Sequence, residues 1–226
     1  MLIKQKPKGT LGIMYMDCVR GKFVRSLADM ISYTQQKFAE TGEFLHVVNA
    51  GCSYHQLARN DLADQIEGDW IFMTDTDHVF APDLITRLLR FSEEYNAKVI
   101  SGLYLSKYPP HGPVACLWGE ETAERVFAHP VQDWNRDKPV LELPGAVGGG
   151  CLLIYREVLE RIEKELKEPP FMEYNKLSED YSFCHRCKRL GIPVFWAPVV
   201  ESHHLIDNAL HSEDYFPPPK SELNPL

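Results

Sequence analysis

The stretch Trp70–Phe80 reads WIFMTDTDHVF. Its first part is a short apolar run of the kind that forms a buried strand. Asp75 and Asp77 end that run one residue apart, where their like charges would repel. A divalent cation relieves such repulsion, and carboxylate oxygens suit Mg²⁺ or Mn²⁺. The stretch therefore predicts a strand that ends at a metal site. The alternative is an ordinary strand-to-helix turn, where aspartate is common.

The residues on either side alternate between short apolar runs and amphipathic segments. This alternation predicts an α/β fold with a mainly parallel sheet covered by helices on both faces. Ligands bind such sheets beyond the carboxyl ends of the strands, where we also expect Tyr15, Asp17 and Asn49 to face a nucleotide. The predicted strands cover 10–16, 43–49, 69–75 and 97–104, and the predicted helices cover 22–40, 53–68 and 82–96.

The second half is less regular. A loop is expected at 106–113, and a glycine-rich turn precedes a strand and a helix within 145–168. We expect one domain over residues 1–204, with a nucleotide-binding half at 10–104 and a smaller, partly antiparallel acceptor-side half at 105–204. An extended, proline-containing tail follows at 205–226. The remaining predicted elements are short strands at 114–119, 125–131 and 139–144, a helix at 178–191 and a strand at 192–198.

Composition excludes few classes of protein. The formal net charge of −8 argues against binding nucleic acid over the whole surface, because phosphate contacts need clustered Lys and Arg. No apolar run reaches the roughly 18 residues of a membrane helix. The six cysteines are scattered and are expected to be reduced, which predicts a cytoplasmic protein, in the host cytoplasm if a virus encodes it. Cys184 and Cys187 lack the second pair of ligands that a structural zinc needs.

Several segments together resemble the GT-A fold glycosyltransferases, in particular the broad family-two-like group with bacterial and viral members. The resemblance extends from about Leu11 to His204. It implies a metal-dependent enzyme of hexosyltransferase type that uses Mn²⁺ or Mg²⁺ and a nucleoside-diphosphate sugar as donor. The segments are IFMTDTDHVFAPDLITRLL (71–89), VISGLYLSKYPP (99–110), GAVGGGCLLIYREVLERI (145–162) and SEDYSFCHRCKRLG (178–191).

The resemblance also implies roles for the metal site. Asp77 is expected to bind the metal, and Asp75 to contact the metal or the ribose. A histidine near the end of the domain is expected as a further ligand. His203 is favoured over its neighbour His204 by its distance after the last strand. His78 could also point at the site, but it is expected to be a turn residue that faces solvent or the acceptor.

Catalysis is assigned to the acidic pair at the start of the segment 178–191. By resemblance, Asp180 is the general base of an inverting reaction, with Glu179 beside it. The alternative is that both carboxylates stabilise the amino end of a helix through its dipole. Retaining members need no such base, so inversion is an expectation.

Further contacts to the donor are expected from Arg59, Gly149 and Gly150. Arg59 could reach the diphosphate with its fork of donors, or form a salt bridge on a helix surface. The glycines could let the backbone approach a ligand, or form a tight turn. Asn49 stands where family members usually have an acidic residue, which leaves the nucleobase open. Lys107, Tyr108 and Trp118 are candidates to line the sugar or acceptor site.

Two other functions remain open at this stage. One is a nucleotidyltransferase acting on sugar phosphates, and the other is a GT-A domain that binds nucleotide or carbohydrate without catalysis. The acceptor could be a saccharide, a small molecule, a protein or a modified nucleic acid. A homo-oligomer is equally open.

Overall fold

A computed structural model describes residues 6–15, 19–51, 54–135, 137–206 and 209–210. Asp17 lies outside the described residues. The helices are α1 (Gly21–Ala39), α2 (His55–Asp64), α3 (Leu84–Tyr95), α4 (Arg156–Arg161), which continues into a π-helical turn at Ile162–Leu166, and α5 (Glu179–Arg189). The strands are β1 (Lys6–Tyr15), β2 (Glu43–Gly51), β3 (Trp70–Asp75), β4 (His78–Phe80), β5 (Val99–Leu103), β6 (Ala115–Glu121), β7 (Val126–Pro130), β8 (Leu141–Leu143), β9 (Gly145–Val147), β10 (Cys151–Tyr155), β11 (Val194–Leu205) and β12 (Ala209–Leu210).

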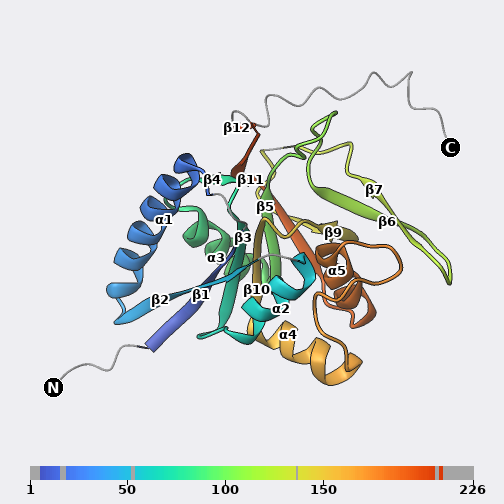
Figure 1. Cartoon of the computed structure of the whole chain (residues 1–226), viewed down its shortest axis with the longest axis horizontal. Helices are drawn as coiled ribbons and strands as arrows, with labels where there is room; N and C mark the ends of the chain where they lie inside the picture. Colours follow the sequence, from blue (N-terminus) through green and yellow to red (C-terminus); the bar gives the residue numbers. More distant parts are fainter. Residues whose placement is uncertain (1–5, 16–18, 52–53, 136, 207–208, 211–226) are drawn as a thin grey trace.

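The α/β class is confirmed. A central sheet has the order β12-β11-β5-β10-β3-β1-β2, with β4 and β8 also paired to β11 (Figure 1). β1 runs parallel to β2 and β3, and β5 runs parallel to β11. The sequence predicted four parallel strands, and the structure adds the antiparallel strand β10 between the third and fourth of them. A separate small sheet, β7-β6-β9, is antiparallel.

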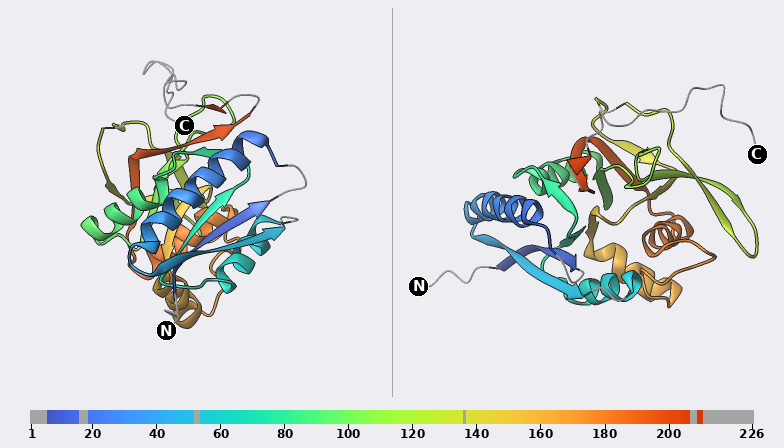
Figure 2. Two further views of the ribbon diagram at one scale, coloured as in Figure 1. Left: turned by 90° about the vertical axis from the view of Figure 1, so that its left-hand side faces the viewer. Right: turned by 45° about the horizontal axis from the view of Figure 1, so that its top comes forward.

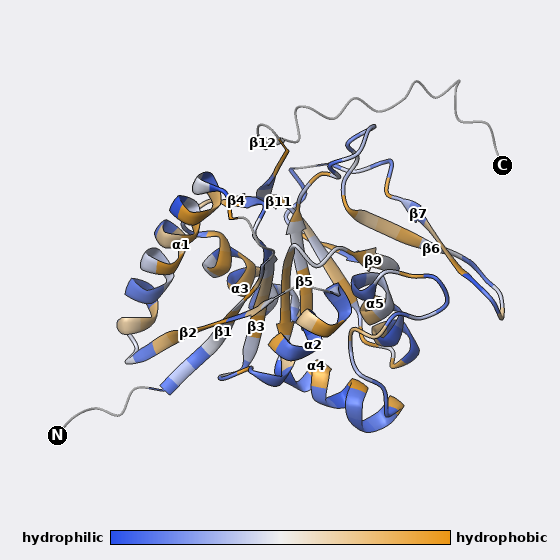
Figure 3. Cartoon of the chain, viewed as in Figure 1, coloured by the Kyte–Doolittle hydropathy of each residue, from blue (hydrophilic) through white to orange (hydrophobic). Residues whose placement is uncertain are grey.

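Helices cover both faces of the central sheet (Figures 1 and 2). Alternate side chains of β3 enter the two hydrophobic clusters, so Ile71 and Met73 lie on one face while Trp70 and Phe72 lie on the other. The first cluster includes residues of α2, α4 and α5, and the second includes residues of α1 and α3. Burial on both faces explains why β3 is continuously apolar. The helices point their hydrophilic sides outward (Figure 3).

β10 brings the second half of the chain to the end of β3. Because β10 is antiparallel to β3, its first residue, Cys151, lies opposite Thr74. The turn that precedes β10 therefore reaches the carboxyl end of β3, beside Asp75. The sequence pattern assigned β3 to the nucleotide-binding half of the domain and this turn to the acceptor-side half. The strand order makes them neighbours.

β11 is longer than the predicted strand 192–198. After a register shift between Ala197 and Glu201, its second part pairs with the short strand β4. His204 then lies opposite His78. The expectation that His78 is a turn residue facing solvent is wrong, because this residue is fully buried on β4.

The membrane and cysteine predictions can be compared with the described residues. No helix among them is long and apolar enough to cross a membrane. Cys184 and Cys187 are free thiols in the first hydrophobic cluster. Burial raises the pKa of Cys184 to about 12, so this side chain is a neutral thiol near pH 7.

Candidate active site

A pocket of about 310 Å³ opens at the carboxyl end of β3. Its walls come from the segments that follow β3 and β5, from the start of α2 and from the end of β11. This is where the parallel strands of an α/β sheet place their ligand. The lining residues are Met14, His55, Asp75, Thr76, Asp77, Tyr104, Ser106, Lys107, Tyr108, Val114 and His204.

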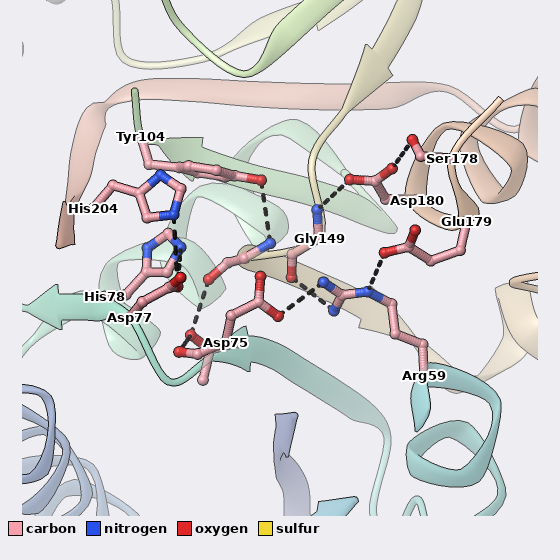
Figure 4. Close-up of polar contacts among 12 residues, drawn as sticks. Arg59, Asp75, Asp77, His78, Tyr104, Gly149, Ser178, Glu179, Asp180 and His204 are labelled. Carbon is pink, nitrogen blue, oxygen red and sulfur yellow. Dashed lines mark hydrogen bonds and ion pairs between the residues drawn. The ribbon is translucent and has the colours of Figure 1, made fainter. Parts of the chain in front are cut away.

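Three potential metal ligands converge in or beside this pocket: Asp77, His78 and His204 (Figure 4). Their ligand atoms lie within 4.8 Å of one another. The Nε2 atom of His78 is 3.7 Å from Oδ1 of Asp77, and Nε2 of His204 is 3.6 Å from the same oxygen. Asp77 Oδ1 and His78 Nε2 are buried and have no hydrogen-bond partner. Because buried polar atoms are rarely left unpaired, these two atoms indicate a missing ligand.

The second ring nitrogen of each histidine, Nδ1, forms a hydrogen bond with another residue of the protein. His204 Nδ1 donates to the carbonyl oxygen of Leu105 at 2.8 Å. A carbonyl can only accept, so in the neutral imidazole the Nε2 lone pair of His204 faces Asp77. His78 Nδ1 lies 2.8 Å from the hydroxyl of Ser202. Such second contacts orient the histidines of metal sites.

The charge states of His78 and Asp77 also fit a cation. Burial, with a contribution from His204, lowers the pKa of His78 to about 3, so this imidazole is neutral near pH 7. Burial alone would raise the pKa of Asp77, but His204, His78 and Lys107 outweigh it and lower the pKa. One carboxylate and two imidazoles therefore fit Mn²⁺ or a similar divalent ion.

The structure separates His203 from this group. Neighbouring residues of a strand point to opposite faces, so His203 points away from Asp77 when His204 points towards it. His203 Nε2 instead lies 3.9 Å from the carboxylate of Glu201. The geometry thus favours His204 over the predicted His203. Asp75, the other predicted ligand, is likewise outside the group of three and contacts Arg59.

Arg59 is buried within the protein instead of facing the pocket. Its Nε donates to Glu179 at 3.1 Å, Nη1 to the carbonyl of Gly149 at 3.0 Å and Nη2 to Asp75 at 2.9 Å. Burial would lower the pKa of Arg59, but Asp75 and Glu179 outweigh burial and raise it, so the guanidinium stays charged. Of the two roles expected for Arg59, the geometry favours the salt bridge over the diphosphate contact, and the side chain ties α2, β3, the glycine turn and α5 together.

We expect Arg59→Met to destabilise the fold by about 3–5 kcal/mol, because it leaves Asp75 and Glu179 without their shared partner. Urea unfolding followed by circular dichroism measures the loss. Arg25→Met, on the exposed side of α1, is the matched control and should cost little. A variant with unchanged stability but weakened nucleotide binding would show that Arg59 contacts the donor instead.

The glycine turn is buried against protein side chains. A Cβ on Gly149 would collide with the guanidinium of Arg59, and a Cβ on Gly150 would lie 2.5 Å from His78 Nε2 and 3.2 Å from Asp75 Oδ2. Gly150 N also donates to the hydroxyl of Tyr104 at 3.2 Å. The space in which these glycines were predicted to contact a ligand is therefore filled by the side chains of Arg59, His78 and Asp75.

Gly150→Ala is expected to weaken Mn²⁺ binding by roughly tenfold or more, because the new methyl displaces His78; overpacking of this kind costs about 1–3 kcal/mol. Calorimetric titration with Mn²⁺ and a thermal melt measure the two effects. Gly21→Ala is the control, since a Cβ there meets nothing within 4 Å. Unchanged Mn²⁺ affinity in a folded Gly150→Ala protein would remove His78 from the proposed ligands.

Asp180 is the second residue of α5 and is half-buried. Its Oδ2 accepts from Gly149 N at 3.1 Å, while Oδ1 accepts from Tyr181 N at 2.8 Å and from the hydroxyl of Ser178. Burial and the charge of Glu179 raise the pKa of Asp180 despite these donors. In Figure 4, Gly149 lies between Asp180 and Arg59. Asp180 is therefore connected to Asp75 through the glycine turn and Arg59.

The predicted nucleoside contacts are less closely tied to the pocket. Tyr15 ends β1 and is 41% exposed, and Asn49 is exposed near the end of β2. Because β1 and β2 are parallel, the two side chains lie at the same edge of the sheet, but neither lines the pocket.

Sequence reasoning missed Tyr104. Its ring packs edge-on against His78 and His204, with centroid distances of 4.8 and 5.6 Å. The signal in the sequence that could have identified Tyr104 is its position directly after β5, where the end of a parallel strand places ligand-binding residues.

Comparisons with known proteins agree with the fold. The sequence model described as glycosyltransferase-like family 2 matches residues 22–217. No curated protein matches significantly. Among solved structures, the chain is similar to GalNAc-T7, determined with UDP, GalNAc and Mn²⁺, at a TM-score of 0.58 and 12% identity. The match covers 90% of this chain and 44% of GalNAc-T7, and it supports a GT-A fold.

Proposed function

The chain belongs to the glycosyltransferase-like family 2, and we propose that it transfers a hexosyl group from a nucleoside-diphosphate sugar to an acceptor hydroxyl with inversion. The observation that carries the proposal is the pair of unpartnered buried atoms, Asp77 Oδ1 and His78 Nε2, which face His204 Nε2. Asp77, His78 and His204 would hold the divalent ion. When bound, such an ion stabilises the negative charge that develops on the diphosphate leaving group.

The donor is proposed to occupy the pocket with its diphosphate near Asp77. Asp75 borders the same pocket, and its Oδ1 is held by Arg59, which leaves Oδ2 available to a sugar or ribose hydroxyl. Tyr15 and Asn49 are proposed to lie towards the nucleoside, since they lie at or near the carboxyl ends of β1 and β2. The same role is proposed for Asp17 from the sequence alone. The nucleobase and the acceptor are not specified by these contacts.

Asp180 is proposed as the general base. A carboxylate offers about four lone-pair positions, and backbone and hydroxyl donors occupy three of those on Asp180. Its raised pKa makes it a stronger base than an ordinary aspartate. Glu179 acts on Asp180 by raising that pKa and on Arg59 by an ion pair, so we assign it a positioning role.

A thermal-shift screen of nucleotide sugars with Mn²⁺ tests the donor assignment. The correct donor should raise the melting temperature, because a ligand that binds only the folded state stabilises it by mass action. Slow hydrolysis of that donor should accompany binding. Release of pyrophosphate from a nucleoside triphosphate and a sugar phosphate would instead support a nucleotidyltransferase. Binding without turnover for any acceptor class would support a non-catalytic domain.

A further inference from the structure

Asp77 has different neighbours at its two oxygens. Oδ1 faces the two histidine nitrogens, whereas Oδ2 forms an ion pair with Nζ of Lys107. Lys107 comes from the loop that follows β5, and its side chain is 37% exposed at the pocket. Among the described residues, Lys107 is the lysine or arginine that pairs with Asp77.

Lys107 is well placed to change partners. The base of its loop is closed by a hydrogen bond from Ser106 N to the carbonyl of Gly112 at 2.9 Å. Tyr108, at the tip of the loop, is 78% exposed. The long flexible stem of a lysine lets its ammonium group move several ångströms while the backbone stays in place. The ammonium group of Lys107 can therefore lie either at Asp77 or within the pocket that this side chain lines.

An ammonium group and a divalent cation repel each other when both contact one carboxylate. A half-buried carboxylate with no cation beside it is equally unfavourable. Asp77 therefore needs one positive partner, and it gains little from a second one. A nucleoside diphosphate in the pocket would supply negative oxygens within the reach of a released lysine.

We propose that Lys107 and the divalent cation compete for Asp77, and that Lys107, once released, contacts the diphosphate of the donor. The inference rests on the function proposed above. In the metal-free protein, Lys107 then neutralises the charge of Asp77. In the protein with metal and nucleotide sugar bound, it contacts the diphosphate. Removal of Lys107 therefore has opposite effects on the two affinities, because it removes a competitor of the metal and a partner of the diphosphate.

The test is calorimetric titration of chelator-treated protein, first with Mn²⁺ alone and then with UDP at saturating Mn²⁺. Lys107→Met is expected to bind Mn²⁺ about fivefold more tightly than the wild type, since the competitor is gone. It is expected to bind UDP roughly tenfold more weakly, because a charge-assisted hydrogen bond is lost. Lys107→Arg keeps the charge and should stay near wild type in both titrations. Lys98→Met, which removes a lysine paired with Glu157 away from the pocket, is the matched control.

Each outcome bears on the proposal. Mn²⁺ affinity that is unchanged or weaker in Lys107→Met, with the wild type binding Mn²⁺, would overturn the competition while leaving the proposed function in place. Unchanged UDP affinity would overturn the diphosphate contact. Absence of Mn²⁺ binding in wild type and variant alike would overturn the proposed function, and the inference with it. A melting curve of each variant identifies any loss that comes from misfolding.

Discussion

Asp77→Asn is expected to lower the rate of sugar transfer by roughly a thousandfold, which corresponds to about 4 kcal/mol of lost transition-state stabilisation. An amide is neutral and binds a hard divalent cation poorly, so the variant should also lose the rise in melting temperature that Mn²⁺ gives the wild type. Without metal, the variant should be somewhat less stable than the wild type, because the substitution removes the ion pair with Lys107. Steady-state kinetics at several Mn²⁺ concentrations and a thermal melt measure these effects.

Asp64→Asn makes the same chemical change on an exposed residue at the end of α2 and should leave activity unchanged. The comparison separates a loss of metal from a general loss of negative charge. If folded Asp77→Asn kept its activity within about threefold and still responded to Mn²⁺, the metal site would lie elsewhere.

The second large effect is expected at Asp180. Asp180→Asn should reduce turnover by about 10²- to 10⁴-fold, the range for loss of a general base, while Mn²⁺ and UDP affinities stay unchanged. Glu173→Gln changes an exposed carboxylate in the preceding loop and serves as the control. Activity that survives in Asp180→Asn would contradict the assignment and favour a retaining reaction, which needs no base at this position.

The pH profile gives a second readout for Asp180. A general base acts when deprotonated, so activity must fall as pH decreases through its pKa. Because burial and Glu179 raise that pKa, the acid limb of kcat/KM should lie at higher pH than for an ordinary aspartate. Glu179→Gln removes one of the raising charges and should shift the limb to lower pH. If the acid limb of Glu179→Gln stays in place or moves to higher pH, Glu179 does not raise the pKa of Asp180, and the account is contradicted.

Local pattern predicted the features that depend on neighbouring residues. The apolar run Trp70–Asp75 predicted a buried strand, and the position of Asp75 and Asp77 at its end predicted residues at a pocket. The helix predicted at 178–191 agrees with α5 within two residues at each end. These predictions succeed because strand burial and helix capping depend on residues a few positions apart.

The choice between His203 and His204 could not be made in this way. In a strand, a shift by one residue exchanges the two faces. β11 changes register between Ala197 and Glu201, so counting from its predicted start does not give the face of either histidine. Pairing with β4 decides it, and that pairing joins residues more than a hundred positions apart along the chain.

For Arg59, which could bind the diphosphate or form a salt bridge, a local signal favoured the salt bridge. The buried residues of α2 are Ala58, Arg59, Leu62 and Ala63, which is the spacing of one helix face. A charge on an apolar face predicts a buried ion pair more readily than a ligand contact. The partners themselves, Asp75 and Glu179, could not be identified before the strand order placed the glycine turn between β3 and α5.

The most direct test of the central claim is a crystal grown with Mn²⁺ and UDP and measured at a wavelength where manganese scatters anomalously. The account predicts one strong anomalous peak in contact with a carboxylate oxygen of Asp77, Nε2 of His78 and Nε2 of His204, with Lys107 turned from Asp77 towards the diphosphate. A peak bound to other residues, or an ordered UDP with no manganese beside Asp77, would contradict it.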